Sequence, residues 1–263
     1  MTERQSRTDG KVYFIGAGPG AVDLITVRGR RLIDTADCII YAGSLVNPVL
    51  FSGCRVPLHD SAALHLEEII EIMAAVVEQG GTVARVHTGD PALYGAIGEQ
   101  MARLEQRGIA YEVVPGVSSA FAAAAALGVE LTLPEVTQSV IITRREGRTP
   151  VPERESLTRL AASGSTMMIF LSVGMIEGVV ADLLAGGYSH ATPVAVVMKA
   201  SWPDQRVVTG TLADIGAAVQ VAGIAKTAMI CVGEVFSSNQ PSVRSRLYDP
   251  EFSHGGRPDG GTR

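Results

Sequence analysis

The sequence is poor in aromatic residues and in cysteine. Phe, Trp and Tyr make up 5% of the 263 residues, with a single Trp, and there are three cysteines. Cys38, Cys54 and Cys231 lie far apart and lack the spacing of a metal site. Nothing indicates a disulfide framework, so we expect a protein of the reducing cytoplasm. The five histidines show no ligand spacing either, so no metal site is predicted.

Long hydrophobic runs and an excess of positive charge are also lacking. The longest apolar run, 120–129, is too short to cross a bilayer, and the polar residues 1–10 do not resemble a signal peptide. The net charge of −5 argues against a nucleic-acid partner. We therefore expect neither membrane nor nucleic acid as a partner. An anionic small substrate stays open, because local arginines can outweigh the total charge.

The sequence is rich in small and apolar residues, and its first half alternates strand and helix patterns. Hydrophobic residues make up 46% of the chain. This alternation predicts βαβ units and a parallel sheet, and hence an α/β fold. The expected strands are 12–15, 38–41, 82–86 and 111–114, and the expected helices are 23–35, 64–79, 96–107 and 118–127.

A break in this rhythm at 128–138 predicts a domain boundary. We expect an N-terminal α/β domain over 11–130 and a C-terminal α/β domain over 131–236. Residues 237–263 are polar and rich in Gly, Ser and Arg, which predicts a disordered tail. In the second domain we expect strands at 139–143, 166–171, 194–198, 205–208 and 228–232, and helices at 153–162, 175–185 and 212–221.

The stretch from His87 to Pro91 is the first of three loops that follow predicted strands. Gly89 can adopt backbone angles closed to other residues, and Pro91 suits the first turn of a helix, which we expect near Tyr94. Asp90 either caps that helix or contributes to a binding site at the carboxyl end of the strand. His87 is a candidate donor to a substrate carboxylate, or else forms a structural hydrogen bond.

The loop from Gly16 to Ala21 matches the dinucleotide pattern G-x-G-x-x-G/A directly after a strand. A ribose-binding acid should then stand at the end of the next strand, but that strand ends Tyr41-Ala42-Gly43. Pro19 also removes one backbone N–H from the loop. A nicotinamide or flavin site is therefore disfavoured, and a plain strand-to-helix turn stays open.

The third loop, Pro115 to Ser119, also follows a predicted strand. Ser118 or Ser119 either caps the following helix or contacts a ligand. No G-x-S-x-G elbow accompanies them, so hydrolase chemistry is unsupported. Because the three loops follow strands of one sheet, we expect them to face the same crevice.

Together these motifs resemble the tetrapyrrole methylases, the S-adenosylmethionine-dependent enzymes of sirohaem and cobalamin synthesis. The resemblance covers roughly residues 11–236. It rests on Gly16-x-Gly-Pro-Gly20 with Asp23-Leu-Ile-Thr26, Gly89-Asp90-Pro91, Val114-Pro-Gly-Val-Ser-Ser119, Gln205-Arg-Val-Val-Thr-Gly-Thr-Leu212 and Val232-Gly-Glu-Val235. Thr88 and Ala92 stand where the precorrin-2-forming members usually carry Gly and Phe, which favours the branch that acts on precorrin-4.

The resemblance implies two α/β domains with an active-site trough between them, a homodimer, and S-adenosylmethionine as cofactor. The implied reaction is methylation of precorrin-4, or of its cobalt-bearing form, at carbon 11. A nucleotide-dependent oxidoreductase and a tetrapyrrole carrier are the alternatives.

The resemblance also implies site residues, and it assigns catalysis to positioning, with Asp90 and His87 as candidate catalytic residues. The implied cofactor contacts are Pro19, Thr88, Gly89, Asp90, Leu93, Ser118, Ser119, Leu171, Ala200, Thr227 and Ala228. The candidate substrate contacts are Gly18, Arg28, Arg31, His87, Arg144 and Arg145.

Overall fold

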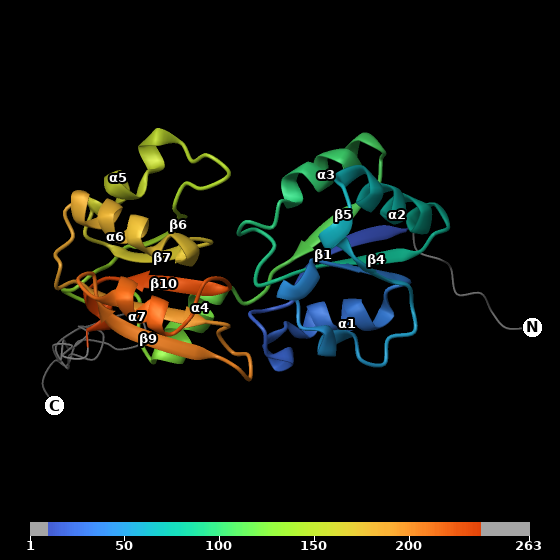
Figure 1. Cartoon of the computed structure of the whole chain (residues 1–263). Helices are drawn as coiled ribbons and strands as arrows, with labels where there is room; N and C mark the ends of the chain where they lie inside the picture. The colour runs from blue at the N-terminus through green and yellow to red at the C-terminus, as the bar shows by residue number, and fades with distance from the viewer. Residues whose placement is uncertain (1–9, 238–263) are drawn as a thin grey trace, which may run out of the picture. The chain divides into compact units, whose positions relative to one another are not determined.

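The computed structural model describes residues 10–237, which separate into two compact units (Figure 1). The first unit comprises residues 10–122 together with 199–205, and the second comprises 123–198 and 206–237. The units divide within a helix rather than at the break in the sequence rhythm. The tail expected to be disordered lies, from residue 238 onward, outside the described residues.

The sheet of the first unit has five strands, all parallel, in the order β3-β2-β4-β1-β5. The predicted parallel sheet is therefore confirmed for this unit, and the short β3 was not predicted. Because β4, β1 and β5 are neighbours, the loops after them leave the same edge of the sheet. The strands are β1 (Lys11–Gly16), β2 (Cys38–Tyr41), β3 (Leu58–Asp60), β4 (Thr82–His87) and β5 (Tyr111–Val114).

Helices cover both faces of this sheet. Helix α1 (Val27–Thr35) packs on the face of Ile15 and Val86, whereas α2 (Leu66–Glu78) and α3 (Ile97–Gln106) pack on the face of Phe14 (Figure 1). The chain crosses the sheet in one direction from β1 to β2 and in the other from β4 to β5. Both crossovers can be right-handed only if their helices lie on opposite faces of the sheet. The helix after β1 and the helix after β4 therefore lead away from each other, which leaves a crevice position between these two strands.

Local signals set where these helices begin. The Thr26 side chain accepts a hydrogen bond from the amide of Gly29 at 3.0 Å and starts α1, so the expected helix 23–35 splits into a 3-10 turn and α1. The prediction of a helix start near Tyr94 was wrong. Tyr94 and Ala96 have φ of 57° and 49°, which no right-handed helix accommodates, and α3 begins only at Ile97.

The sheet of the second unit is mixed, in the order β6-β7-β10-β8-β9. Only β6 and β7 are parallel, and the other pairs are antiparallel. The sequence predicted these strands but not their directions. They are β6 (Val140–Arg144), β7 (Thr166–Phe170), β8 (Pro193–Met198), β9 (Arg206–Thr211) and β10 (Ala228–Val232).

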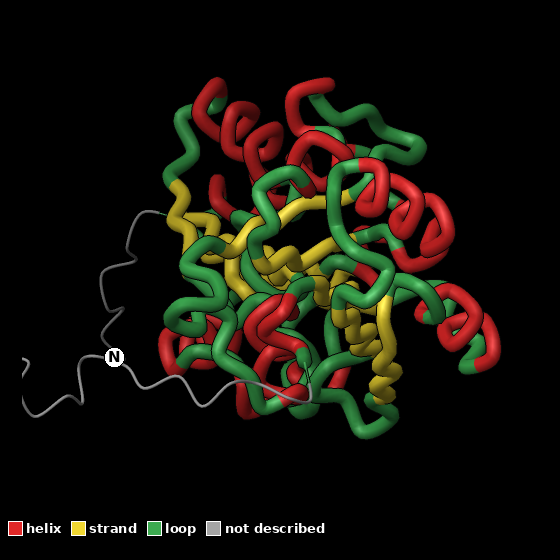
Figure 2. Tube along the Cα trace, turned by 90° about the vertical axis from the view of Figure 1, so that its left-hand side faces the viewer, coloured by secondary structure: helices red, strands yellow, loops and turns green. Residues whose placement is uncertain are grey.

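One face of the second sheet carries three helices, which share a single apolar core with it. Figure 2 marks the helices in red and the strands in yellow along the chain trace. These helices are α5 (Leu157–Ala161), α6 (Ile176–Ala185) and α7 (Ile215–Val221); α4 (Ser119–Leu127) contains the division between the units. The 3-10 helices are η1 (Val22–Leu24), η2 (Gly43–Leu45), η3 (Pro48–Phe51), η4 (Ser61–Ala63), η5 (Glu153–Glu155), η6 (Val173–Met175) and η7 (Glu234–Phe236).

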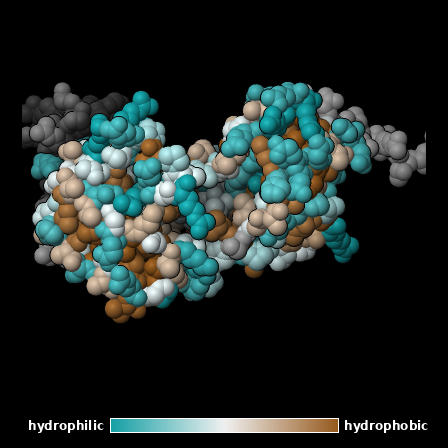
Figure 3. Space-filling model, turned by 45° about the horizontal axis from the view of Figure 1, so that its top comes forward, coloured by the Kyte–Doolittle hydropathy of each residue, from teal (hydrophilic) through white to brown (hydrophobic). Residues whose placement is uncertain are grey.

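Apolar side chains also reach the surface. Val27 and Val221 are 89% and 91% exposed. Figure 3 shows hydrophobic patches interrupted by hydrophilic residues on the face that it presents. Among residues 10–237, no helix has both the length and the apolar character needed to span a bilayer.

Candidate functional site

The three loops predicted to face one crevice do come together. The amide of Gly89 donates to the carbonyl of Gly18 at 2.8 Å, and the amide of Gly18 donates to the carbonyl of Gly89 at 3.3 Å. This pair of hydrogen bonds joins the loop after β1 to the loop after β4. It lies where the helices on the two faces diverge, which is where open α/β sheets bind ligands.

The third loop packs on the other two through bare backbone. A Cβ atom on Gly116 would lie 2.2 Å from the carbonyl oxygen of Gly89 and 2.7 Å from the Cα of Gly16. No side chain fits into that space. Gly16 and Gly116 are thus required by their close approach to each other, and main-chain atoms form this contact.

The Asp90 carboxylate links two of these loops. Its Oδ1 accepts a hydrogen bond from the amide of Ala92 at 2.8 Å, and its Oδ2 accepts one from the amide of Gly116 at 2.9 Å. Asp90 therefore caps the turn that precedes α3. The alternative that it caps the helix itself was wrong, because α3 begins only at Ile97. Its role in binding a ligand stays a prediction.

The hydroxyl groups near the loops differ in availability. Ser118 is 4% exposed, and its Oγ accepts from the amide of Ala120 at 3.3 Å, which makes it the cap of α4. Ser119 is the first residue of that helix. Thr88 is half-buried, and no hydrogen-bond partner of its hydroxyl is present in the described part of the chain. The Thr88 hydroxyl is thus more available to a ligand than that of Ser118. Leu93, another predicted cofactor contact, is also half-buried.

Side chains that sequence reasoning missed hold the glycine-rich loop. The Asn47 Nδ2 donates to the carbonyl of Gly20 at 2.9 Å, and the Trp202 Nε1 donates to the carbonyl of Pro19 at 2.9 Å. The two loop carbonyls are thus engaged within the protein. The lone tryptophan of the chain, in a polar loop between two strands, was the signal that could have drawn attention to it.

A buried polar cluster lies behind the loop after β4. Arg85, 4% exposed, donates from Nε to the Oε1 of Gln100 at 3.0 Å, and Gln100 donates to the carbonyl of Ala96 at 3.2 Å. Burial lowers the pKa of Arg85 to about 10. Burial, with the nearby charge of Arg85, lowers the pKa of His87 to about 3.

His87 itself is enclosed on the face of the sheet that carries α2 and α3. It is 3% exposed, its ring lies 6.0 Å from that of Phe14, and its Nε2 has no hydrogen-bond partner in the described chain. A neutral, enclosed imidazole argues against the expected donation to a substrate carboxylate, and that role is not carried forward. Within residues 10–237, no group of three or more His, Cys, Asp or Glu side chains is placed to hold a metal ion.

The candidates in the second unit gather at one end of its sheet. Arg144 pairs with Phe170, directly before Leu171, and Ala228 pairs with Met198. Leu171 is 67% exposed. Leu171 and Thr227 have φ of 53° and 54°, a left-handed conformation that is unusual for these residue types. Backbone strain of this kind concentrates at functional sites, which supports a role for this end of the sheet.

The four candidate arginines are not equally free. Arg28 forms an ion pair with Glu112, and Arg145 pairs with Asp182 at 2.7 Å. The Arg144 guanidinium donates to carbonyls of its own loop, at 3.1 Å to Thr149 and 2.7 Å to Pro150. Arg31 is exposed, and within residues 10–237 its guanidinium has no partner. It also borders a pocket of about 470 Å³ beside η1 and α1.

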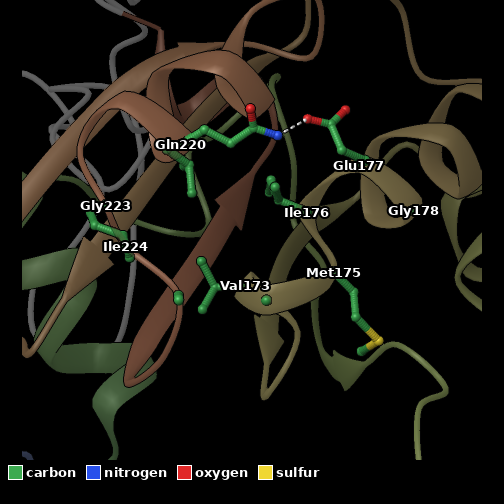
Figure 4. Close-up of a pocket in the computed structure, with 11 residues that line it drawn as sticks. Val173, Met175, Ile176, Glu177, Gly178, Gln220, Gly223 and Ile224 are labelled. Atoms are coloured by element: carbon green, nitrogen blue, oxygen red, sulfur yellow. Dashed lines mark hydrogen bonds between the residues drawn. The ribbon is translucent and has the colours of Figure 1, made fainter.

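A pocket of about 420 Å³ lies in the second unit, between the start of α6 and the end of α7 (Figure 4). At its rim the side-chain Nε2 of Gln220 donates a hydrogen bond to the Oε1 of Glu177 at 3.0 Å. None of the predicted site residues lines it, and it offers no buried charge. Its lining residues are Val173, Gly174, Met175, Ile176, Glu177, Gly178, Val219, Gln220, Gly223, Ile224 and Ala225.

The loop cluster of the first unit has a distinctive charge. Its segments 16–21, 88–93 and 115–119 contain no lysine or arginine, and Asp90 is their one acid. Such a surface suits a ligand with positive charge. A glycine-rich loop holds a pyrophosphate with main-chain N–H groups at a helix start, but here Pro19 lacks that group and α1 begins only at Val27. Backbone groups, the Thr88 hydroxyl and one carboxylate therefore fit a sulfonium compound better than a dinucleotide.

The fold and this loop cluster define a two-sheet α/β protein with a candidate small-molecule site built from main-chain loops. The sequence model of the tetrapyrrole (corrin/porphyrin) methylases matches residues 11–216. A cobalt-precorrin-4 C(11)-methyltransferase of Methanocaldococcus jannaschii is 55% identical over 93% of this chain and 95% of its own. A precorrin-4 C(11)-methyltransferase of Pseudomonas aeruginosa is 50% identical over 94% of this chain and 98% of its own.

Solved structures agree. The X-ray structure of a cobalt precorrin-4 methyltransferase, a cobalamin biosynthetic enzyme, superposes with a TM-score of 0.84 at 48% identity, covering 86% of this chain and 96% of that one. A uroporphyrin-III C-methyltransferase of Thermus thermophilus complexed with S-adenosylhomocysteine gives 0.70 at 26% identity, over 86% and 93%. The chain belongs to the tetrapyrrole methylase family. The resemblance stated from its motifs is thereby confirmed.

Proposed function

We propose that the protein transfers a methyl group from S-adenosylmethionine to carbon 11 of precorrin-4, giving precorrin-5 in cobalamin biosynthesis. The observation that carries this proposal is the joining of three main-chain loops through Gly18, Gly89 and Gly116. It occurs in a chain that is about half identical, over nearly its full length, to relatives named for this reaction.

The chemistry asks for alignment more than for acid–base catalysis. When bound, the sulfonium supplies an electrophilic methyl group; its carbon–sulfur bond breaks as a carbon–carbon bond forms, and S-adenosylhomocysteine leaves with the electron pair. Holding the reacting atoms in line can lower the barrier by about 7–11 kcal/mol. A site of fixed backbone turns can act in this way without a catalytic dyad.

The chain's own residues can be given roles in this scheme. The Thr88 hydroxyl and the main chain at Gly89 would hold the donor, while Asp90 keeps the loop in place and presents negative charge near the cationic sulfur. Leu171, Ala200, Thr227 and Ala228 remain proposed cofactor contacts. Arg31 is the best placed of the four arginines to bind a substrate carboxylate, because it has no protein partner within residues 10–237.

Two forms of substrate fit the relatives equally. The Methanocaldococcus relative is named for the cobalt-bearing substrate and the Pseudomonas relative for the metal-free one, at similar identities. We propose methylation at the same carbon for both. A homodimer, implied by the family resemblance, is part of the proposal and is tested by light scattering of the purified protein.

The decisive experiment supplies precorrin-4, or its cobalt form, with methyl-labelled S-adenosylmethionine and analyses the product by mass spectrometry. We expect a gain of one labelled methyl group, located at carbon 11 by NMR. Bound pigment without methyl transfer would indicate a carrier. Tight binding of NADH with no binding of S-adenosylhomocysteine would instead favour the oxidoreductase alternative.

A further inference from the structure

The chain leaves the second sheet at the end of β8, forms a short compact segment, and returns as β9. This segment, residues 199–205, packs in the first unit. The amide of Trp202 donates to the carbonyl of Lys199, and the amide of Gln205 to the carbonyl of Trp202, both at 3.0 Å. Lys199 and Ser201 have φ of 49° and 69°, so the backbone is held in an unfavourable conformation on both sides of the buried Ala200.

The segment grips the glycine-rich loop at two points. The Trp202 Nε1 donates to the carbonyl of Pro19 at 2.9 Å, and the amide of Ala21 donates to the Oγ of Ser201 at 3.0 Å. The indole also fills the space beside Gly20, where a Cβ atom would lie 2.1 Å from its Cδ1 and Nε1. The ring of the chain's single tryptophan therefore fits only because residue 20 is a glycine.

We propose that residues 199–205 act as a clasp that holds the glycine-rich loop in its ligand-binding conformation, and that Trp202 is a positioning residue for the methyl donor. This inference rests on the proposed function, because it takes the loop to be part of the cofactor site. It goes beyond that function by giving residues 199–205 a role in cofactor binding, through side chains that hydrogen-bond to the backbone of the loop.

The physical reason lies in the composition of the loop. Gly16, Gly18 and Gly20 leave a free loop with many backbone conformations, and ordering them on binding would weaken affinity. A clasp that already fixes the carbonyl of Pro19 and the amide of Ala21 removes that penalty before the ligand arrives. The clasp is itself braced, because the amide of Ser201 donates to the Oε1 of Gln205 at 2.7 Å.

The first test removes the hydrogen bonds one at a time in the full chain. Trp202→Phe keeps an aromatic ring but loses the N–H, and Ser201→Ala loses the acceptor. Each should raise the Kd for S-adenosylhomocysteine, measured by calorimetry, and the KM for S-adenosylmethionine by about three- to tenfold, the effect of one hydrogen bond. The kcat and the KM for the tetrapyrrole should stay within about twofold, a split that general destabilisation would not give.

The second test fills the space beside the indole. Gly20→Ala should displace the ring and weaken S-adenosylhomocysteine binding at least as much as Trp202→Phe. Gly98→Ala is the matched control, because a Cβ atom there meets no described atom within 4 Å. The single tryptophan gives an independent signal: in the wild type its emission should change on addition of S-adenosylhomocysteine.

The outcomes separate the two proposals. If the wild type fails to bind S-adenosylhomocysteine, the proposed function falls, and the clasp with it. If the wild type binds and Trp202→Phe, Ser201→Ala and Gly20→Ala leave both Kd and KM unchanged, the clasp alone is overturned. If Trp202→Phe does not fold, Ser201→Ala and the wild-type emission decide, because neither alters the indole.

Discussion

The carboxylate of Asp90 accepts a hydrogen bond from the amide of Gly116 at 2.9 Å, across two loops that follow different strands. The same carboxylate holds the turn after Pro91 through the amide of Ala92. One short side chain thus fixes the loop after β4 both to itself and to the loop after β5. The shape of the proposed cofactor site depends on this pair.

Asp90→Ala should therefore weaken both the fold and the site. Two backbone donors lose their acceptor, so we expect the free energy of unfolding to fall by roughly 1–3 kcal/mol. The Kd for S-adenosylhomocysteine should rise tenfold or more, and Asp90→Asn, which keeps one acceptor, should lie between. Asp34→Ala serves as control, because Asp34 lies in an exposed ion pair with Arg30. Unchanged affinity in Asp90→Ala would show that the loop has a structural role only.

Gly116→Ala tests the contact of bare backbone between the loops. The added Cβ would meet the carbonyl oxygen of Gly89 and the Cα of Gly16, neither of which can rotate away. We expect a loss of about 1–3 kcal/mol or more in unfolding free energy, measured by urea denaturation, together with loss of cofactor binding. Gly98→Ala should instead change the unfolding free energy by less than about 0.5 kcal/mol, since its Cβ enters open space at the start of α3. Equal effects of the two substitutions would contradict this account.

The sequence was most informative where local chemistry and topology coincide. Each of the three loops follows a predicted strand, so the expectation that they meet required only a parallel sheet with neighbouring strands. The strand Cys38–Tyr41 and the strand Tyr111–Val114 have the bounds that were predicted. The capping role left open for Ser118 is confirmed by its hydrogen bond to the Ala120 amide.

Other features depend on contacts between residues far apart in the chain, which no local pattern records. A buried strand is apolar whether its neighbours run parallel or antiparallel, so the insertion of β10 between β7 and β8 could not be predicted. The burial of His87 depends on what packs over it. The partner of Trp202 lies at Pro19, at the other end of the chain, and a helix start at Tyr94 fails because of its backbone angle.

The buried guanidinium of Arg85 makes Gln100 a sensitive position. Within the described chain no carboxylate pairs with Arg85, and Gln100 supplies the closest acceptor at 3.0 Å. Gln100→Leu should leave a buried donor unsatisfied and lower the unfolding free energy by about 1.5–3 kcal/mol. Gln100→Glu keeps an acceptor and adds an opposite charge, so its loss should be smaller. The order of the two variants in thermal and urea denaturation checks this, and a reversed order would contradict it.

His87 predicts a specific loss of stability in acid. Its pKa is about 3 in the folded protein, because burial and the charge of Arg85 disfavour the imidazolium, against an ordinary value near 6.5. Above about pH 6.5 both states are neutral at this position. Below it, the unfolded chain binds a proton that the folded chain refuses until about pH 3. As the pH is lowered from about 6.5 to about 3, the unfolding free energy should therefore decrease by up to about 1.4 kcal/mol per pH unit.

His87→Leu isolates that contribution, because leucine cannot take up a proton in either state. Relative to the wild type, the variant should gain about 2 kcal/mol of unfolding free energy between pH 7 and pH 5, whatever its stability at pH 7. The carboxylates shared by both proteins cancel in this difference. Urea denaturation across that range measures it, with the exposed His190→Gln as the matched control. Parallel stability profiles for wild type and His87→Leu would mean that the imidazole takes up its proton in the folded protein, and so is not enclosed.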